Sequence, residues 1–186
     1  MKTIPMIFNP AMVSALVEGN KTVTRRPMKL ETKDCDLHCF LKPSEVAGEV
    51  NNGNFQNSLY KPGDLIWVRE TFRQFDSSSE CGCSDYPCGC PSNGTYLYKA
   101  FSDSCEDRWK PSIHMPRKAS RLTLRITDVR CERVQLITEE SAEKEGVAPA
   151  FIDEFGNCPT PPRFKNGFYK LWDSIYSNWH ENPWVW

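Results

Sequence analysis

A cluster of cations and hydroxyls lies between residues 19 and 26, which read Gly-Asn-Lys-Thr-Val-Thr-Arg-Arg. Side chains two apart share one face of an extended strand, so one side would carry Thr22, Thr24 and Arg26. Lys21 would project from the opposite side with its odd-numbered neighbours. Hydroxyls and cations held close together bind anions and polarise carbonyl groups. The same pattern is also typical of a surface strand in which threonine favours β structure and arginine is solvated.

Four of the nine cysteines lie close together as two Cys-Gly-Cys units. Four thiolates are a chemically sensible ligand set for tetrahedral Zn²⁺, although paired cysteines are usually separated by two residues rather than one. The intervening glycine allows the sharp bend that such close spacing needs. Free or oxidisable thiols and disulfides are the alternatives, and Cys35, His38 and Cys39 could replace one pair. We therefore predict a structural Zn²⁺ and no organic cofactor, with the ligands Cys81, Cys83, Cys88 and Cys90.

Further candidates for ligand binding are aromatic and basic residues outside the first cluster. Trp67 could stack on a nucleic-acid base, and Arg69 and Arg117 could pair with phosphate. His114 lies in a connector bounded by prolines, where it could contact a base or simply pack. Trp67 lies in an apolar run, so a role in the core is its main alternative. We assign ligand binding to Arg26, Trp67, Arg69, His114 and Arg117.

Composition limits the classes of protein that this chain can belong to. The 186 residues are 39% hydrophobic, which suits one globular domain. The net charge is −1, but residues 1–33 hold six Lys/Arg against two Asp/Glu, and residues 108–133 hold eight against two. These segments could share one basic face on a neutral protein. The alternative is that both are ordinary solvated strands.

The sequence contains no apolar run of membrane-spanning length, and Met1 to Pro10 does not have the pattern of a secretory signal. A cytoplasmic location is therefore expected, with no membrane partner. A reducing compartment also disfavours disulfides, which supports the metal or free-thiol interpretation of the cysteines.

The elements that would position these residues are short. Asn9-Pro10 begins a helix that Gly19 ends, and Thr138 caps a second helix that Gly146 ends. Strands are indicated for residues 65–68, 95–100 and 122–126, a third helix for residues 164–175, and a final short strand for residues 184–186.

These elements predict an α+β fold, a small mixed β-barrel with short flanking helices. The chain is predicted to be a single domain, residues 1–186. It would contain an irregular insertion at residues 30–61 and a Cys-rich loop insertion at residues 74–94. The sequence does not indicate the oligomeric state.

The first cluster resembles the motif Gly-x-Lys-x-x-(Glu or Thr)-x-Arg of the ASCH family, in the PUA-like superfamily. Gly19, Lys21, Thr24 and Arg26 match it. Four further collinear pieces, similar to phage and prophage members, are residues 62–70, 109–117, 127–147 and 168–186. The resemblance covers most of the chain outside residues 30–61 and 74–94, and it implies a PUA-like barrel.

The resemblance implies a basic cleft that binds a nucleotide, a modified nucleoside or nucleic acid, with RNA favoured. In a phage-type member, the location would be the cytoplasm of the bacterial host. One branch of the family hydrolyses the acetyl amide of N4-acetylcytidine with a lysine, a threonine and a glutamate. By motif position these residues are Lys21, Thr24 and Glu145, with Thr24 as the nucleophile, Lys21 as its base and Glu145 as the orienting group.

Binding is the function we expect, and hydrolysis of N4-acetylcytidine-like nucleosides is the alternative, so enzymatic activity stays open. A third interpretation is a phage accessory protein that docks on host proteins through the Cys-rich loop. Glu145 could also be an ordinary solvated carboxylate at a helix end. Both main interpretations require Lys21 and Glu145 to converge on a common hollow.

Overall fold

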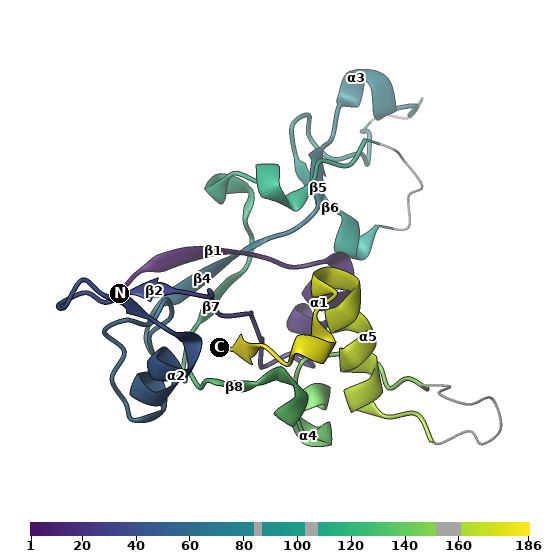
Figure 1. Ribbon diagram of the computed structural model, residues 1–186. Helices are drawn as coiled ribbons and strands as arrows, with labels where there is room; N and C mark the ends of the chain where they lie inside the picture. Colours follow the sequence, from purple (N-terminus) through teal and green to yellow (C-terminus); the bar gives the residue numbers. More distant parts are fainter. Residues whose placement is uncertain (84–86, 103–107, 152–160) are drawn as a thin grey trace. The chain divides into compact units, whose positions relative to one another are not determined.

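The computed structural model describes residues 1–83, 87–102, 108–151 and 161–186. Helices and short strands alternate along the chain (Figure 1), which confirms the predicted α+β class. Within these described ranges, the strands form one three-stranded and three two-stranded sheets and no closed barrel. The chain divides into two compact units, Met1–Ser14 with Leu65–Leu124, and Ala15–Asp64 with Arg125–Trp186.

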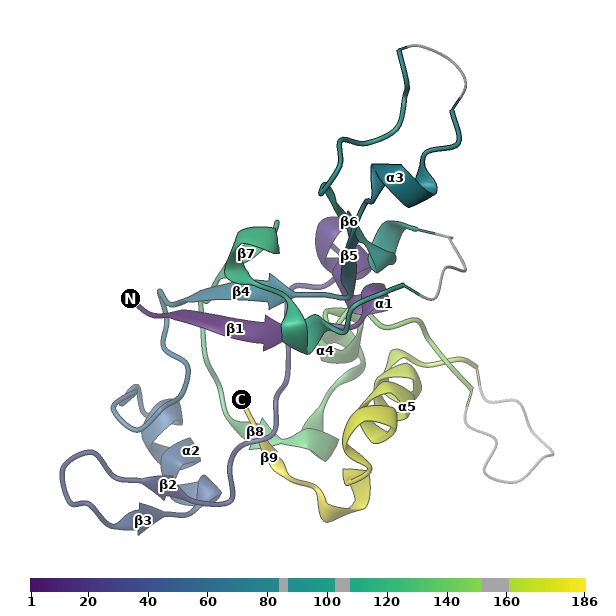
Figure 2. The same ribbon diagram turned by 90° about the horizontal axis from the view of Figure 1, so that it is seen from above.

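The main sheet of the first unit has the strand order β1-β4-β7. Strand β1 (Thr3–Ile7) pairs in parallel with β4 (Leu65–Arg69), and the two strands lie side by side in Figure 2. Strand β7 is Thr123–Arg125. Ile66 and Val68 are buried while their neighbours in β4 are half-exposed, the alternation of a strand with one face in the core.

A second sheet of this unit pairs β5 (Phe72–Gln74) with β6 (Tyr96–Tyr98), and its core consists of Phe72, Met115 and Ala119. The predicted Cys-rich loop connects these two strands and begins with helix α3 (Ser77–Glu80). The described residues between β6 and β7 form short 3₁₀ turns. The 3₁₀ turns of the unit are η1 (Lys99–Phe101), η2 (Ser112–His114) and η3 (Arg117–Ala119).

Helix α1 (Pro10–Val17) begins and ends where the capping residues predicted. The Asn9 side chain accepts a hydrogen bond from the Met12 N–H at 2.8 Å, and Pro10 occupies the first helical position. Gly19 follows the helix with a φ of +80°, a left-handed conformation that glycine adopts without steric cost. The predicted helix is therefore confirmed.

Residues 30–61, for which we expected irregular structure, contain regular elements in the second unit. They are the hairpin of β2 (Thr32–Lys33) and β3 (Phe40–Leu41), and helix α2 (Pro43–Asn51). Pro43 stands at the first helical position, and Glu45 accepts a hydrogen bond from the Lys42 N–H at 2.7 Å. The apolar face of α2 is buried, which explains why a polar-looking segment folds as a helix.

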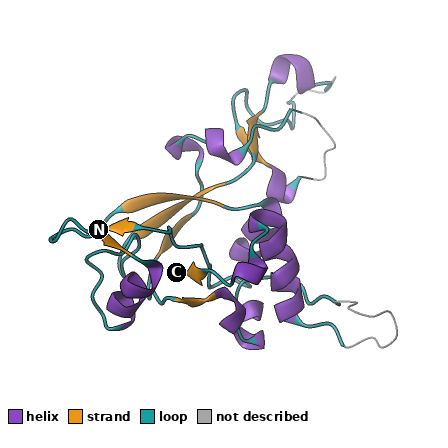
Figure 3. Cartoon of the chain, in the orientation of Figure 1, coloured by secondary structure: helices purple, strands orange, loops and turns teal. Residues whose placement is uncertain are grey.

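The remainder of the second unit contains two helices that contact each other, α4 (Glu139–Glu143) and α5 (Phe164–Tyr176) (Figure 3). Thr138 caps α4 as predicted, since its side chain accepts a hydrogen bond from the Ser141 N–H. Helix α5 is also confirmed, and it buries Phe168 and Trp172, four residues apart on one face. The other elements are β8 (Glu132–Arg133), η4 (Val134–Leu136), η5 (Trp179–Glu181) and β9 (Trp184–Val185).

The core of the second unit joins α2 to the strands near the end of the chain. Strands β8 and β9 pair in antiparallel fashion, which confirms a short final strand. Trp184 and Trp186 pack against this core. None of the helices in the described ranges is both long and apolar enough to cross a bilayer. The buried residues of this cluster are Met28, Val46, Ala47, Val50, Val129 and Cys131.

Candidate functional site

The segment after α1 runs alongside the end of α4, within the second unit. Lys21 and Glu145 form an isolated antiparallel bridge, and the N–H groups of Thr22 and Val23 both donate to the Lys144 carbonyl. Gly146 makes this approach possible. Its φ is +73°, and a Cβ there would lie 2.8 Å from the Cβ atoms of both Ala15 and Lys21. Backbone pairing therefore brings together two residues of the Lys/Thr/Glu set that the family resemblance predicted.

The Lys21 ammonium group is enclosed by acceptors. Its Nζ lies 2.5 Å from Glu145 Oε2, 2.9 Å from the Glu145 carbonyl oxygen and 2.8 Å from the Val23 carbonyl oxygen. Lys21 is 5% exposed and Glu145 is 3% exposed. Three acceptors match the three N–H donors of an ammonium group, so the charge is buried but fully hydrogen-bonded.

Burial lowers the pKa of Lys21 below its ordinary value, against the opposing effect of Glu145. The neighbouring cations Arg26 and Arg25 lower this pKa further. The direction is the one that a lysine base requires.

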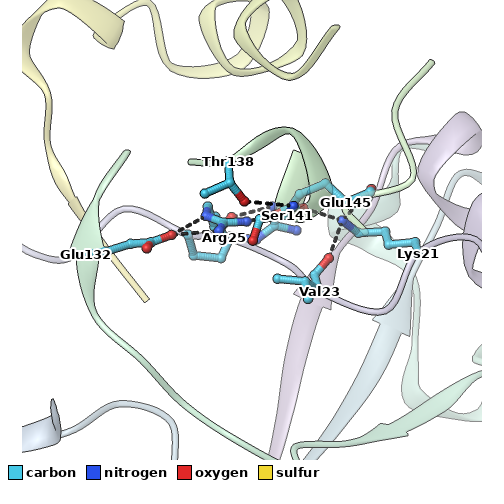
Figure 4. A network of polar contacts seen from close by, with 8 residues as sticks. Lys21, Val23, Arg25, Glu132, Thr138, Ser141 and Glu145 are labelled. Atoms are coloured by element: carbon cyan, nitrogen blue, oxygen red, sulfur yellow. Dashed lines mark hydrogen bonds and ion pairs between the residues drawn. The ribbon is translucent and has the colours of Figure 1, made fainter. Parts of the chain in front are cut away.

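Arg25 extends this ion pair into a network of four charged side chains (Figure 4). Its Nη1 donates to Glu145 Oε1 at 3.0 Å, while Nε and Nη2 donate to Glu132 Oε1 at 2.9 and 2.6 Å. Two cations face two carboxylates, so the network with Lys21 is neutral overall. Arg25 is 8% exposed, whereas the Glu132 side chain is 37% exposed and is the end of the network that solvent reaches.

We did not predict Arg25 and Glu132 as site residues. Arg25 could have been found, because it shares the strand face of Lys21. Nothing in the sequence around Glu132 distinguishes it from other carboxylates.

Thr24 and Arg26, also predicted for the site, are both half-buried. Among the described residues, the hydrogen bonds of Lys21 and Glu145 go to each other and to neighbours other than Thr24. The structure therefore brings together two members of the predicted Lys/Thr/Glu set through hydrogen bonds, and Thr24 is not bonded to either.

A hollow of about 440 Å³ lies in the second unit, but Lys21 and Glu145 are not in its wall, so they do not converge on this hollow as we expected. It is formed by the end of α2, the turn that follows and the segment that leads into β8. Glu132 belongs to this wall, so the charged network reaches the hollow only through that carboxylate. The lining residues are Val50, Asn51, Gly53, Phe55, Asp128, Val129, Arg130, Cys131 and Glu132.

The other predicted binding residues all lie in the first unit, and two of them, Arg69 and Arg117, lie over the indole ring of Trp67. The guanidinium carbon of Arg69 lies 5.4 Å from the centroid of the Trp67 ring, and that of Arg117 lies 5.6 Å from it. Arg69 donates to the carbonyl groups of Ser112 and Ile113, next to the exposed His114. We call Trp67, Arg69, His114 and Arg117 the arginine–tryptophan surface. Trp67 is half-buried rather than part of the core.

The two Cys-Gly-Cys units come together in the first unit. The sulfur atoms of Cys81 and Cys88 lie 3.4 Å apart, and those of Cys83 and Cys90 lie 3.3 Å apart. All four sulfurs lie within 4.8 Å of one another. In a tetrahedral site with Zn–S bonds of about 2.3 Å, the sulfurs are about 3.8 Å apart. The four cysteines could therefore hold a metal ion such as zinc.

The thiols of this cluster do not share one pKa. A hydrogen bond from the Cys90 N–H, together with the neighbouring thiols, lowers the pKa of Cys88 to about 7. Interaction with the Cys83, Cys88 and Cys81 thiols raises the pKa of Cys90 to about 12. Cys88 therefore gives up its proton before Cys90 does, and a thiol must lose its proton to bind a metal.

The remaining cysteines are separate from this group. Within the described ranges, Cys35, His38 and Cys39 are exposed near the β2–β3 hairpin and do not belong to a ligand cluster. Cys131 is buried and belongs to the core of the second unit. Cys105 and Cys158 lie outside the described residues.

No known protein family, curated protein or solved structure matches this chain. The function must therefore be argued from the geometry of these three clusters.

Proposed function

We propose that this chain binds the phosphate groups of nucleic acid, with RNA favoured, at the arginine–tryptophan surface. The observation that carries the proposal is the placement of two guanidinium groups at 5.4 and 5.6 Å from one indole ring. Arg117 and His114 are exposed on the same connector, so this surface is open to a ligand.

The two arginines over Trp67 are suited to binding an anion. A guanidinium that lies over an aromatic face keeps its N–H donors in a plane that can match the oxygens of a phosphate. Arg69 already donates from Nε and Nη2 to the Ser112 and Ile113 carbonyls, so the exposed Arg117 is the arginine that we assign to the phosphate. The stacking also limits the rotamers of two long side chains, which reduces the entropy lost on binding. Arg117 is further held by a 3.2 Å hydrogen bond from its Nη2 to Thr123 Oγ1.

This arrangement changes the role that we expected for Trp67. Its ring already has two cations close to it, so the indole serves as a platform for arginines rather than for a base. The surface would then recognise the backbone of a nucleic acid, or the phosphate of a nucleotide, with little dependence on base sequence.

Membership of the ASCH family and a PUA-like barrel are part of the same proposal. They are supported by the order of the motif pieces and by the contact between Lys21 and Glu145, two residues whose counterparts act together in the hydrolase branch of that family. Under this proposal, the chain would be a phage-type member of the family, located in the cytoplasm of a bacterial host.

Hydrolysis of an N4-acylated nucleoside is the second candidate, favoured by the Lys21–Glu145 contact and the lowered pKa of Lys21. Thr24 would attack the amide carbonyl and pass its proton through Lys21 to the leaving amine, and water would then release acetate from the acyl-threonine. Because Lys21 and Glu145 are at most 5% exposed, this reaction requires a local opening. The hydrolase function would be established if the protein released acetate from N4-acetylcytidine, Lys21→Ala abolished the release and Lys144→Ala preserved it. No acetate release from the unmodified protein would exclude this function.

We also propose that the ion held by the four cysteines is Zn²⁺ with a structural role. Four thiolates complete a tetrahedron and leave no position for a substrate or for catalytic water.

The experiment for the main proposal compares two arginine variants. Fluorescence anisotropy with a labelled single-stranded RNA would be measured at about 50 and 200 mM salt. Arg117→Ala should weaken binding severalfold and reduce the salt dependence by about one phosphate contact. Arg130→Ala removes the same charge from an exposed position in the second unit and is the matched control. Equal affinities for Arg117→Ala and the unmodified protein would overturn the proposal.

A further inference from the structure

Glu70 is a buried carboxylate next to the arginine–tryptophan surface that the proposed function does not use. It is 1% exposed, and Arg121 grips it with two parallel hydrogen bonds, Nε to Oε1 at 2.9 Å and Nη2 to Oε2 at 2.8 Å. A bidentate pair of this kind fixes both partners in one geometry. Because one partner lies on the residue after β4 and the other after η3, the pair ties these two segments together.

Arg121 is itself held between two aromatic rings. Its guanidinium carbon lies 4.0 Å from the centroid of Tyr98 and 4.8 Å from that of Phe101. The Tyr98 hydroxyl also donates to the Ala119 carbonyl at 2.8 Å, within η3. The Arg121 side chain is 31% exposed, so these contacts limit the movement of a side chain that is partly open to solvent.

The connector that carries Arg117 is attached to the end of β4 on both sides of that arginine. Before it, the Glu70 N–H donates to Met115 Sδ at 3.2 Å. After it, the Ser120 hydroxyl donates to the Val68 carbonyl at 2.8 Å, and Arg121 binds Glu70. The position of Arg117 relative to Trp67 is therefore set by anchors that surround it in the sequence.

We propose that Glu70, through Arg121, is a positioning residue for phosphate binding, because it holds the connector where Arg117 stacks on Trp67. This inference rests on the proposed function and deepens it. Glu70 would not touch the ligand, and its effect would pass entirely through the placement of Arg117.

A purely electrostatic effect of Glu70 would change RNA affinity in the opposite direction, so the two explanations can be distinguished. Glu70→Gln removes a negative charge from the protein and keeps the shape of the side chain. If charge alone mattered, RNA would bind the variant equally well or more tightly. If Glu70 positions Arg117, RNA should bind about fivefold more weakly, within the coupling range of residues in one network.

A double-mutant cycle separates positioning from a general loss of structure. RNA affinity and salt slope would be measured for the unmodified protein, Glu70→Gln, Arg117→Ala and the double variant, with folding checked by circular dichroism. Positioning predicts that Glu70→Gln weakens binding only when Arg117 is present, and that its salt slope falls by about 0.7, one single-strand phosphate contact. Equal losses in both backgrounds would overturn the inference.

A second variant keeps the test decisive if Glu70→Gln does not fold. Arg121→Lys retains the charge but loses the bidentate geometry, so it should reproduce the weaker binding only when Arg117 is present. The positioning role would be rejected if every folded Glu70 or Arg121 variant bound RNA with unchanged affinity while Arg117→Ala still bound RNA weakly. The proposed function would then stand. Unchanged affinity in Arg117→Ala would reject the proposed function itself.

Discussion

Lys21 and Glu145 stand 124 residues apart in the sequence, and their side chains meet at 2.5 Å with almost no exposure to solvent. A buried ion pair of this kind specifies which two segments must lie together, because neither charge tolerates burial alone.

Removing one partner of this pair should be far more damaging than removing an exposed pair. Among the residues that the structure describes, Lys21→Met leaves the buried Glu145 paired with Arg25 alone, so we expect a loss of about 3 kcal/mol in the free energy of unfolding. Lys144→Met breaks the exposed pair with Glu140 and should cost about 0.5 kcal/mol or less. Urea denaturation compares the two. Similar urea midpoints for both variants would show that the buried ion pair contributes no more to stability than the exposed pair.

Gly146→Ala should destabilise the chain by about 2–4 kcal/mol, because it combines a left-handed backbone with a steric overlap. The added Cβ would lie 2.8 Å from both Ala15 and Lys21. Gly53→Ala is the control, since Gly53 has a φ of +84° but nothing within 4 Å of its added Cβ. Urea midpoints of the two variants isolate the cost of the overlap. If both variants lost the same stability, the close approach at Gly146 would be disproved.

The four-cysteine cluster should bind one Zn²⁺ per chain. Native mass spectrometry of protein purified without chelator should show this stoichiometry, and Cys83→Ser should reduce zinc affinity by at least about tenfold. Cys39→Ser removes an exposed thiol in the hairpin of the second unit and should keep the ion. Unchanged zinc affinity in the Cys83 variant would assign the metal to other residues.

The buried thiol of Cys131 predicts a loss of stability at alkaline pH. Burial raises its pKa from 9.0 to about 12, so the folded chain keeps a proton that the unfolded chain releases. This residue's contribution to stability is fully present below pH 9 and falls as the pH rises towards 12, with a slope approaching about 1.4 kcal/mol per pH unit. The difference between unmodified protein and Cys131→Ala should narrow or reverse over that window. A constant difference in urea midpoints from neutral pH to about pH 10.5 would contradict it.

Local features were the most predictable part of the fold. The start of α1 at Asn9-Pro10 and the cap of α4 at Thr138 follow from hydrogen bonds within a few residues, so the sequence contains all that is needed. Helix α2 was missed although Pro43 and Glu45 gave a usable start signal, because the surrounding polar residues concealed a short apolar face.

Long-range relationships were harder to predict. The meeting of Lys21 and Glu145 was expected only because one branch of the family that this chain resembles uses a lysine and a glutamate at these positions. The link from Arg25 to Glu132 depends on where β8 pairs with β9, and no residue pattern specifies that register. Likewise, Trp67 could be assigned to binding, but its contact with Arg117 depends on how a connector of 3₁₀ turns folds back on β4.

The four-charge network also limits how this chain can be shortened. Its cations come from residues 21–25 and its carboxylates from Glu132 and Glu145. A fragment beginning near residue 30 would keep α2, β8, α4 and α5, yet it would enclose a carboxylate with neither of its counter-ions. Expression trials of the second unit should therefore retain residues 15–29, even though none of the strands β1 to β9 lies in that segment.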